Sequence, residues 1–221
     1  MLFNSQVFLY AFLPLAILGY YGAARLSGSR AAKVWLCIAS FVFYGWLNPA
    51  LDLLLAASIA FNFVASRHLL GDRSGGSPHQ GGILFAAVAA DLLLLFYYKY
   101  LFPLLDFFHA FGWTALEPGS VVLPIGISFF TFTQIGFLVD CRQGMVRDRG
   151  FLDYVLFVTF FPHLIAGPIL HHREVMPQFA SDATYRLRVE NMAVGLTLFT
   201  VGLAKKVLLA DSIAPDRKSV V

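Results

Sequence analysis

One apolar stretch decides how the rest of the chain is arranged: Phe160-Phe161-Pro162-His163-Leu164-Ile165-Ala166-Gly167-Pro168-Ile169. Its composition places it inside a membrane, yet two prolines, a glycine and a histidine interrupt it. Each proline removes a backbone donor, clashes with the preceding turn and disfavours helical geometry in the residue before it. In hydrocarbon such breaks survive only where protein or a water-filled cavity surrounds them. The stretch therefore predicts a buried or cavity-lining turn at membrane depth.

The composition of the whole chain indicates an integral membrane protein. Its 221 residues are 58% hydrophobic and 13% charged, with a mean hydropathy of +0.71. A soluble domain is about half apolar and about a quarter charged. The apolar residues are spread along the chain, which favours several spans in the lipid bilayer. The net charge of +3 is scattered beside apolar runs and gives no sign of nucleic-acid binding. We therefore predict an all-α, polytopic helix bundle with one broken, possibly re-entrant segment.

Seven apolar runs are candidates for full or partial spans. They cover residues 7–24, 34–47, 50–66, 83–98, 121–139, 151–170 and 191–204. Among the polar side chains within these runs are Asn62, Asp91 and Gln134. The aromatic segment 100–111 is expected to be interfacial or a short, half-buried helix. Lys205 and Lys206 are expected to close the last span at the membrane surface, where either could meet an anionic head group.

Lysine and arginine residues set the predicted orientation. The short loops that carry them cover residues 25–33, 67–82 and 140–150. The positive-inside rule places these loops in the cytoplasm and the N-terminus outside. Beyond residue 150 two courses stay open. A full crossing by 151–170 puts Arg173, Arg186 and Arg188 outside, whereas a re-entrant turn keeps them inside; basic bias favours re-entry, and the length of the run favours crossing.

Of the ionisable residues within the apolar runs, His163 and Asp91 are the ones that could carry chemistry. His163 could move protons near neutral pH, or it could be a neutral side chain that binds backbone carbonyls freed by Pro162 or Pro168. Asp91 could relay protons or bind a cation, or it could bridge a neighbouring helix while protonated. We favour the structural role for both, because a broken helix must satisfy its backbone groups somehow.

Other known site types are weakly supported. His171 and His172 are adjacent and point in different directions on a helix, and no third ligand lies at a suitable spacing, so we expect no metal site. The sequence shows no Ser-His-Asp order, glycine-rich phosphate loop or cysteine pair, and we expect no bound cofactor. From the residues alone, function stays open between a membrane enzyme and a transporter, since transporters also use interrupted helices.

Several sequence blocks follow one another in the order of a known family. They cover residues 1–5 and 8–14, 39–46, 97–100 (Tyr-Tyr-Lys-Tyr), 123–129 (Leu-Pro-Ile-Gly-Ile-Ser-Phe), 161–168 (Phe-Pro-His-Leu-Ile-Ala-Gly-Pro) and 205–211. Together they resemble the membrane-bound O-acyltransferase family, and within it the alginate O-acetyltransferase branch. The block at 161–168 is the most specific, and the resemblance extends to about Pro215.

The resemblance implies transfer of an acyl group, here acetyl, to a hydroxyl of a polysaccharide. It also implies an essential histidine that follows a tryptophan, whereas none of the three tryptophans (Trp35, Trp46 and Trp113) precedes a histidine. His163 matches a different family position, so the catalytic role is not assigned to it, and we expect no catalytic residue in this chain. The expected cavity-lining or supporting residues are Pro162, His163, Gly167, Pro168, Asp91, Lys205 and Lys206.

The resemblance further implies that residues 1–215 are the N-terminal portion of such an enzyme. The last six residues, Asp-Arg-Lys-Ser-Val-Val, match one reading frame of a common sequencing adapter, so we expect 216–221 to be a non-native tail. Residues 1–215 alone are expected to be inactive. The implied setting is a bacterial inner membrane with polysaccharide acetylation machinery as partners, and the acyl donor stays open. The alternatives are D-alanyl transfer to teichoic acid and a polysaccharide exporter subunit.

Overall fold

The computed structural model describes residues 3–46, 48–71, 78–112, 121–146, 150–165, 167 and 172–210. These residues form helices and loops, and none of them forms a strand, which confirms the all-α prediction. The chain divides into two compact units: residues 1–35 together with 181–221, and residues 36–180. The expected non-native tail at 216–221 lies outside the described residues.

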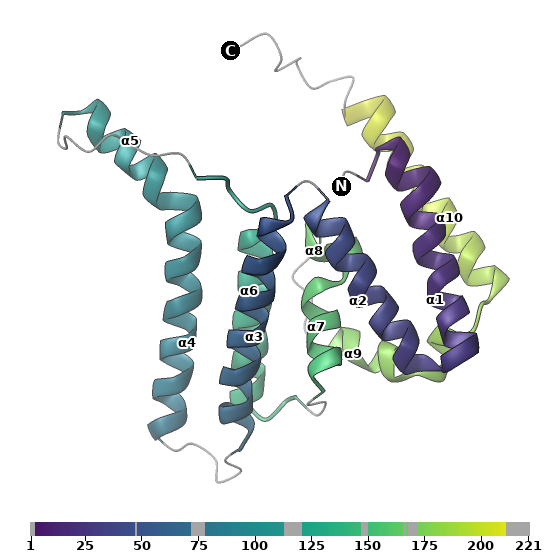
Figure 1. Cartoon of the computed structure of the whole chain (residues 1–221), viewed down its shortest axis with the longest axis horizontal. Coiled ribbons are helices and arrows are strands. Elements are labelled where there is room, and N and C mark those ends of the chain that lie inside the picture. The colour runs from purple at the N-terminus through teal and green to yellow at the C-terminus, as the bar shows by residue number, and fades with distance from the viewer. Residues whose placement is uncertain are drawn as a thin grey trace. The chain divides into compact units, whose positions relative to one another are not determined.

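The first unit pairs the earliest long helix with the last one. Its elements are η1 (Phe8–Phe12), α1 (Leu13–Ser27), η3 (Asp182–Tyr185), α10 (Val189–Ala204) and η4 (Lys205–Ala210). The rings of Phe8 and Phe199 lie 6.4 Å apart, and the Tyr20 hydroxyl donates to the Thr184 carbonyl at 3.2 Å. Because the start of α1 meets the end of α10, and the end of α1 meets the turn before α10, the two helices run antiparallel (Figure 1).

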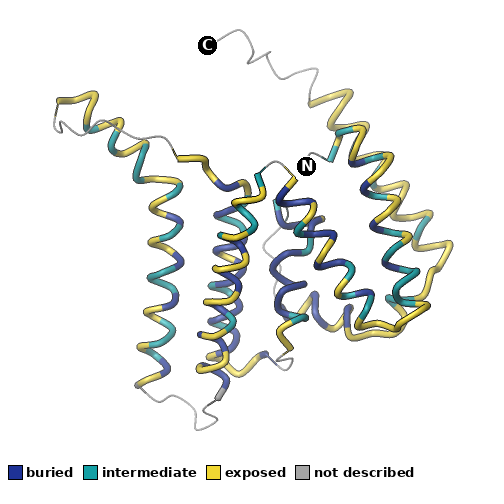
Figure 2. Tube along the Cα trace, viewed as in Figure 1, coloured by how far each residue is buried: buried dark blue, intermediate teal, exposed yellow. Residues whose placement is uncertain are grey.

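The second unit holds the remaining helices. They are α2 (Ser29–Gly45, whose first turns belong to the first unit), α3 (Ala50–Gly71), α4 (Pro78–Phe96), η2 (Tyr97–Leu101), α5 (Phe102–Ala110), α6 (Ile127–Arg142), α7 (Phe151–Thr159), α8 (Phe161–Leu164) and α9 (His172–Ala180). Helices α3, α4 and α6 pack against one another, and α7 packs against α3, α6 and α9. The deepest burial runs along α6 and α7 (Figure 2).

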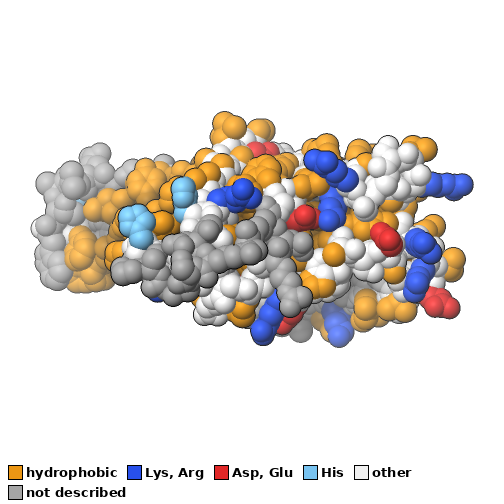
Figure 3. Space-filling model, turned by 90° about the horizontal axis from the view of Figure 1, so that it is seen from below, with side chains coloured by type: hydrophobic (Ala, Val, Ile, Leu, Met, Phe, Trp, Pro, Cys, Tyr) orange, Lys and Arg blue, Asp and Glu red, His pale blue; other side chains and the backbone are white. Residues whose placement is uncertain are grey.

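Four helical stretches are long and apolar enough to cross a membrane: Phe8–Ser27, Ala50–Leu70, His79–Ala110 and Val189–Ala210. A span needs about 20 apolar residues, and α2 and α6 fall a little short with 17 and 16 residues. The protein is thus a multi-pass membrane protein, as its composition predicts. Figure 3 shows lysine and arginine side chains standing among apolar ones on the face seen from below.

The segment 100–111 contains the short, partly exposed helix α5, as one of its two expected forms, and this helix continues directly from the run before it, from His79 to Ala110. The expectation that Lys205 and Lys206 close the last helix is wrong, because helix continues past them to Ala210. Pro14 and Pro103 leave their helices unbroken because each lies in the first turn of an α-helix, just after a π-helical turn. The π-helical turn before each proline accommodates the hydrogen bond that the proline cannot donate.

The segment from α7 to α9 turns back on itself within the second unit. Its beginning lies beside the later part of α6, where Phe137 and Tyr154 are 4.5 Å apart. Its tip lies beside the start of α6, where Phe129 and His163 are 5.8 Å apart. It then returns, because the ring of His172 lies 5.0 Å from Phe137. This hairpin course is the one that re-entry requires.

Within each unit, a basic residue that follows the hairpin lies beside one of the earlier basic loops. In the second unit Arg173 lines a cleft with Gly144 and Met145, in the loop that follows α6. In the first unit Arg186 lines a cleft with Arg25, at the end of α1. Each placement agrees with the positive-inside rule within its own unit. The hairpin course favours the re-entrant alternative over a full crossing, and re-entry stays a prediction.

Candidate functional site

The tip of the hairpin is a helix broken by residues that satisfy its backbone locally. α7 ends at Thr159, Phe160 leaves helical geometry with ψ 105°, and Pro162 lies in the first turn of α8. The Phe161 N–H, which a continuous helix would direct to the carbonyl four residues earlier, donates instead to Ser40 Oγ at 3.2 Å. Ser40 Oγ in turn donates to the Leu36 carbonyl at 2.7 Å.

His163 takes the place that this break leaves open. Its Nε2 lies 3.2 Å from the Phe157 carbonyl, which is the carbonyl that the Phe161 N–H would otherwise bind. Since a carbonyl only accepts, Nε2 carries the hydrogen and donates it. The imidazole is 6% exposed and lies 5.8 Å from the ring of Phe129 and 5.4 Å from that of Phe160. This is the kind of contact that the structural interpretation of His163 predicts.

Two glycines allow the tip to pack closely. Gly126, at the start of α6, has φ +76°, and a Cβ there would lie 2.7 Å from the Leu164 carbonyl oxygen. A Cβ on Gly167 would lie 2.6 Å from Cβ and 2.9 Å from Cα of His163. Side chains rarely adopt a positive φ, and no real Cβ approaches other atoms so closely. Both positions therefore require glycine.

Four of the blocks that carry the family resemblance meet at this end of the second unit. Lys99 Nζ donates to Ser128 Oγ at 3.1 Å, which joins the blocks at 97–100 and 123–129. Gly126 abuts Leu164, which joins 123–129 to 161–168. The ring of Phe43, from the block at 39–46, lies 5.5 Å from that of Phe161. Blocks far apart in the sequence thus form one continuous structure around the hairpin tip.

A buried polar network crosses the same unit. Asn62 donates to Asp91 Oδ1 at 2.8 Å, Gln134 donates to Ser58 Oγ at 2.9 Å, and the Tyr154 hydroxyl donates to Gln134 Oε1 at 3.0 Å. All five side chains are less than 9% exposed. The network therefore joins α3, α4, α6 and α7 by hydrogen bonds, in addition to apolar packing.

Asp91 belongs to this network. Within the described part of the chain, its Oδ2 and Asn62 Oδ1 have no hydrogen-bond partner. Asp91 Oδ1 accepts the hydrogen bond from Asn62 of α3, while Asp91 itself lies on α4. The carboxyl therefore links two helices, which agrees with the structural role favoured for it.

The structure gathers only part of the predicted set of site residues. His163 and Gly167 lie together at the hairpin tip, and Pro162 is exposed beside them. Pro168 lies outside the described residues. Lys205 and Lys206 belong to the first unit, where Lys206 lines a cleft of about 360 Å³ with Phe199 and Gly202.

Sequence reasoning missed some of the residues that shape this region. Ser40 and Tyr154 were not singled out, because a serine or tyrosine in an apolar run is unremarkable until its partner is known. Gln134 carried a signal, as an amide inside an apolar run. Among the described residues no cluster of three metal-ligating side chains occurs, and the residues around the tip supply a shaped and largely apolar wall.

The chain is similar to named acyltransferases along 97% of its length. It is 36% identical to the "Peptidoglycan O-acetyltransferase" of Helicobacter pylori, 36% to the "Probable alginate O-acetylase" of Pseudomonas aeruginosa and 37% to that of Azotobacter vinelandii. It spans 45%, 41% and 42% of these proteins.

A weaker match, 24% identical over 136 residues, is the "Teichoic acid D-alanyltransferase" of Bacillus subtilis, and it covers 61% of the chain. No protein-family model and no solved structure matches. The similarity to the O-acetyltransferases runs through every block that meets at the hairpin tip. The chain therefore belongs to the family of membrane-bound O-acyltransferases.

Proposed function

We propose that the protein takes part in transfer of acetyl groups to hydroxyls of an exopolysaccharide such as alginate, at the inner membrane of a bacterium. The observation that supports this most is the 36–37% identity to relatives named as O-acetyltransferases over 97% of the chain. Because the chain spans less than half of those relatives, the activity is proposed for a protein that contains these residues together with the rest of the catalytic machinery.

The reaction joins a sugar hydroxyl to an acyl donor. The hydroxyl oxygen attacks the acetyl carbonyl, the bond between acetyl group and donor breaks, and a general base accepts the hydroxyl proton. A positioned general base contributes typically a factor of about 10² to 10⁴. We assign this base to no residue of the chain. His163 donates its Nε2 hydrogen to Phe157, which suits a support for the wall of the transfer cavity.

The hairpin tip is the part of the chain that we place at the transfer cavity. A turn that enters the membrane and returns brings side chains to membrane depth without a second full span, and such irregular backbone is tolerated beside protein or a cavity. The tip is fixed by Ser40, Gly126 and His163. A rigid wall of this kind positions reactants, and small misplacements of such walls cost large factors in rate.

A second acceptor is supported by one relative. The Helicobacter pylori protein is named for peptidoglycan, which is also a polysaccharide with free hydroxyls. D-alanyl transfer to teichoic acid has weaker support, since the relative named for it is 24% identical. A polysaccharide exporter subunit is the alternative from a different functional class.

Deletion of the gene in its source bacterium separates these functions. We expect ester-linked acetate to disappear from the extracellular polysaccharide, with the amount of exported polymer unchanged and restored acetylation on complementation. If the acceptor is peptidoglycan, acetate would disappear from peptidoglycan instead. If the protein transfers D-alanine, D-alanine esters would disappear from teichoic acid. Unchanged esters on all three polymers, or loss of the exported polymer itself, would refute acetyl transfer.

A further inference from the structure

The first unit contains a cleft that the proposed reaction does not use. It has a volume of about 900 Å³ and lies where α1 ends and the chain turns into α10. Helix α1 supplies one wall with Ile17, Leu18 and Tyr21. The turn before α10 and the start of that helix supply the other wall with Leu187 and Met192.

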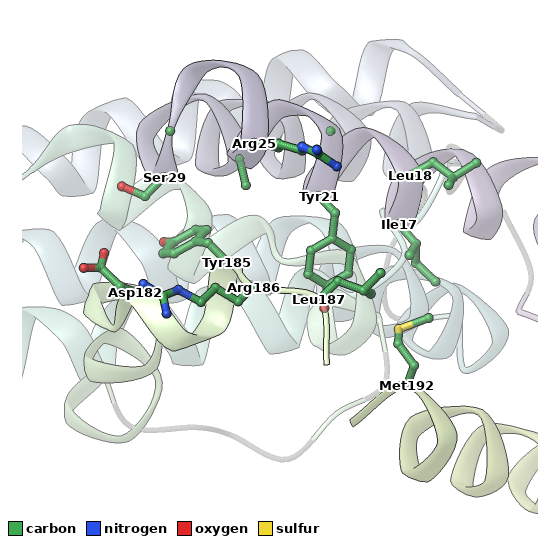
Figure 4. Close-up of a pocket in the computed structure, with 13 residues that line it drawn as sticks. Ile17, Leu18, Tyr21, Arg25, Ser29, Asp182, Tyr185, Arg186, Leu187 and Met192 are labelled. Atoms are coloured by element: carbon green, nitrogen blue, oxygen red, sulfur yellow. The ribbon is translucent and has the colours of Figure 1, made fainter. Parts of the chain in front are cut away.

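The lining changes character along the cleft. Figure 4 shows Ile17, Leu18, Leu187 and Met192 gathered at one end. Ser29, Asp182 and the Arg186 side chain lie at the other end, and Arg25, from α1, lies between the two ends. The cleft is therefore amphipathic, with an apolar part followed by a polar, basic part.

The membrane span of α1 explains this order. The span Phe8–Ser27 has Ile17 and Leu18 in its interior and Arg25 at its end, where the chain leaves the hydrocarbon. The apolar part of the cleft thus lies at the depth of acyl chains and the arginines lie at the depth of head groups. Leu18 is 71% exposed and Leu187 60% exposed, so both side chains are accessible to lipid.

The charge around the polar end favours an anion. Residues 25–33 and 182–190 contain five basic side chains and two acidic ones: Arg25, Arg30, Lys33, Arg186 and Arg188 against Asp182 and Glu190. In the described part of the chain, neither the Arg25 nor the Arg186 guanidinium makes a hydrogen bond or ion pair with another side chain. Guanidinium groups bind phosphate with two parallel hydrogen bonds.

We propose that this cleft binds an anionic glycerophospholipid of the cytoplasmic leaflet. Arg25 and Arg186 hold its phosphate, and an acyl chain lies along Ile17, Leu18, Leu187 and Met192. Asp182 repels a bare phosphate but accepts hydrogen bonds from head-group hydroxyls, and Ser29 can also bind them. A glycerol head group, as in phosphatidylglycerol, satisfies both requirements. Basic pockets between transmembrane helices on the cytoplasmic side bind anionic head groups in this manner.

The test uses purified full-length protein in nanodiscs of neutral phosphatidylcholine that contain a small, titrated fraction of phosphatidylglycerol. Bound lipid is counted by native mass spectrometry. Each arginine that donates a charge-assisted hydrogen bond to the lipid phosphate contributes at least about a fivefold factor in affinity. We therefore expect Arg25→Gln combined with Arg186→Gln to weaken phosphatidylglycerol binding roughly 25-fold or more.

Matched controls separate a defined site from general attraction. Arg30→Gln combined with Arg188→Gln removes the same charge at the same end of the unit without touching the cleft lining, and we expect at most a few-fold loss. Met192→Trp fills the apolar part and should weaken binding with the charges intact. Folding of every variant is checked by its melting temperature in phosphatidylcholine alone, and a variant that fails is replaced by Arg25→Lys combined with Arg186→Lys.

Three outcomes would overturn the proposal. The cleft variant could bind phosphatidylglycerol as the wild type does, or the control pair could lose as much affinity as the cleft pair. Alternatively, soluble pyrophosphate could displace the lipid and bind equally well in its absence, which would make the cleft a site for a soluble anion. Because the readout is lipid binding, failure here leaves the proposed acetyl transfer untouched, and the reverse also holds.

Discussion

Helices α7 and α10 are both apolar, yet the chain buries them very differently. In the second unit α7 buries six of its nine residues, from Tyr154 to Thr159. In the first unit none of the residues of α10 is buried (Figure 2). Hydropathy alone does not separate the two, because lipid and protein interior both accept apolar side chains. Around α7 the polar groups and glycines are enclosed by protein, whereas on α10 Thr197 is exposed and a Cβ on Gly195 would meet nothing within 4 Å.

The comparison predicts that replacing glycine by alanine lowers the free energy of unfolding in the second unit and raises it in the first. Gly126→Ala forces a positive φ on a side chain and drives its Cβ to 2.7 Å from the Leu164 carbonyl oxygen, so we expect a loss of roughly 2–5 kcal/mol in the free energy of unfolding. Gly195→Ala in α10 meets nothing within 4 Å and should gain about 0.5–1 kcal/mol from helix propensity.

Thermal unfolding of the purified protein, followed by size-exclusion chromatography with fluorescence detection, measures both variants. Gly167→Ala should resemble Gly126→Ala because its Cβ would meet His163. An unchanged melting temperature for both Gly126→Ala and Gly167→Ala would show that the hairpin tip is not held against α6. It would also refute the predicted difference between the two units.

The sequence predicted the parts of this picture that depend on local chemistry. Pro162 predicted a break, because a proline at membrane depth needs a surrounding that satisfies the freed groups. Ser40, which accepts the freed hydrogen bond, was not predictable. It lies 122 residues before Pro162 in the sequence, and no local pattern connects the two residues. The π-helical turns before Pro14 and Pro103 were also missed, as proline alone does not distinguish a break from a first helical turn.

Each unit has a tyrosine whose hydroxyl donates a hydrogen bond: Tyr154 in the second unit and Tyr20 in the first. Tyr154→Phe removes the donor to Gln134 Oε1, and Gln134 is fully buried, so its oxygen cannot turn to water. We expect a loss of about 1–3 kcal/mol in the free energy of unfolding. Tyr20→Phe removes the donor to the Thr184 carbonyl, which lies in a half-buried turn, and should cost about 0.5–1.5 kcal/mol.

A double-mutant cycle decides whether the polar network is the cause. Tyr154→Phe combined with Gln134→Leu removes both partners, so the coupling energy between the two positions should be at least about 0.5 kcal/mol. Additive effects of the two changes would mean that Tyr154 acts through packing against Phe137 instead of through its hydroxyl.

Substitution of His163 tests whether the hydrogen-bonded structure of the hairpin tip matters for activity. His163→Ala removes one buried hydrogen bond to Phe157, and a loss of about 1 kcal/mol in positioning corresponds to roughly fivefold in rate. We expect acetylation in complemented cells to fall by about that factor without disappearing. His163→Gln, whose amide can donate to the same carbonyl, should recover part of the activity. Complete loss in both variants with an unchanged melting temperature would make His163 a candidate for a direct role in the reaction.

The smallest effects are expected for two threonine substitutions, which test whether α10 faces lipid or protein. Thr159 and Thr197 make the same hydrogen bond, from Oγ1 to the carbonyl four residues earlier at 2.8 Å, and Thr159 is fully buried whereas Thr197 is exposed. Thr159→Val should cost about 0.5–1 kcal/mol, because the hydroxyl lies in a packed interior. Thr197→Val should change the free energy of unfolding by less than about 0.5 kcal/mol, as surface substitutions usually do. In a membrane, valine is also at least as favourable as threonine toward lipid. If Thr197→Val lowers the free energy of unfolding of the full-length protein as much as Thr159→Val does, then α10 packs against protein in the full-length molecule. The difference in burial between α7 and α10 would then hold only for the residues that the structure describes.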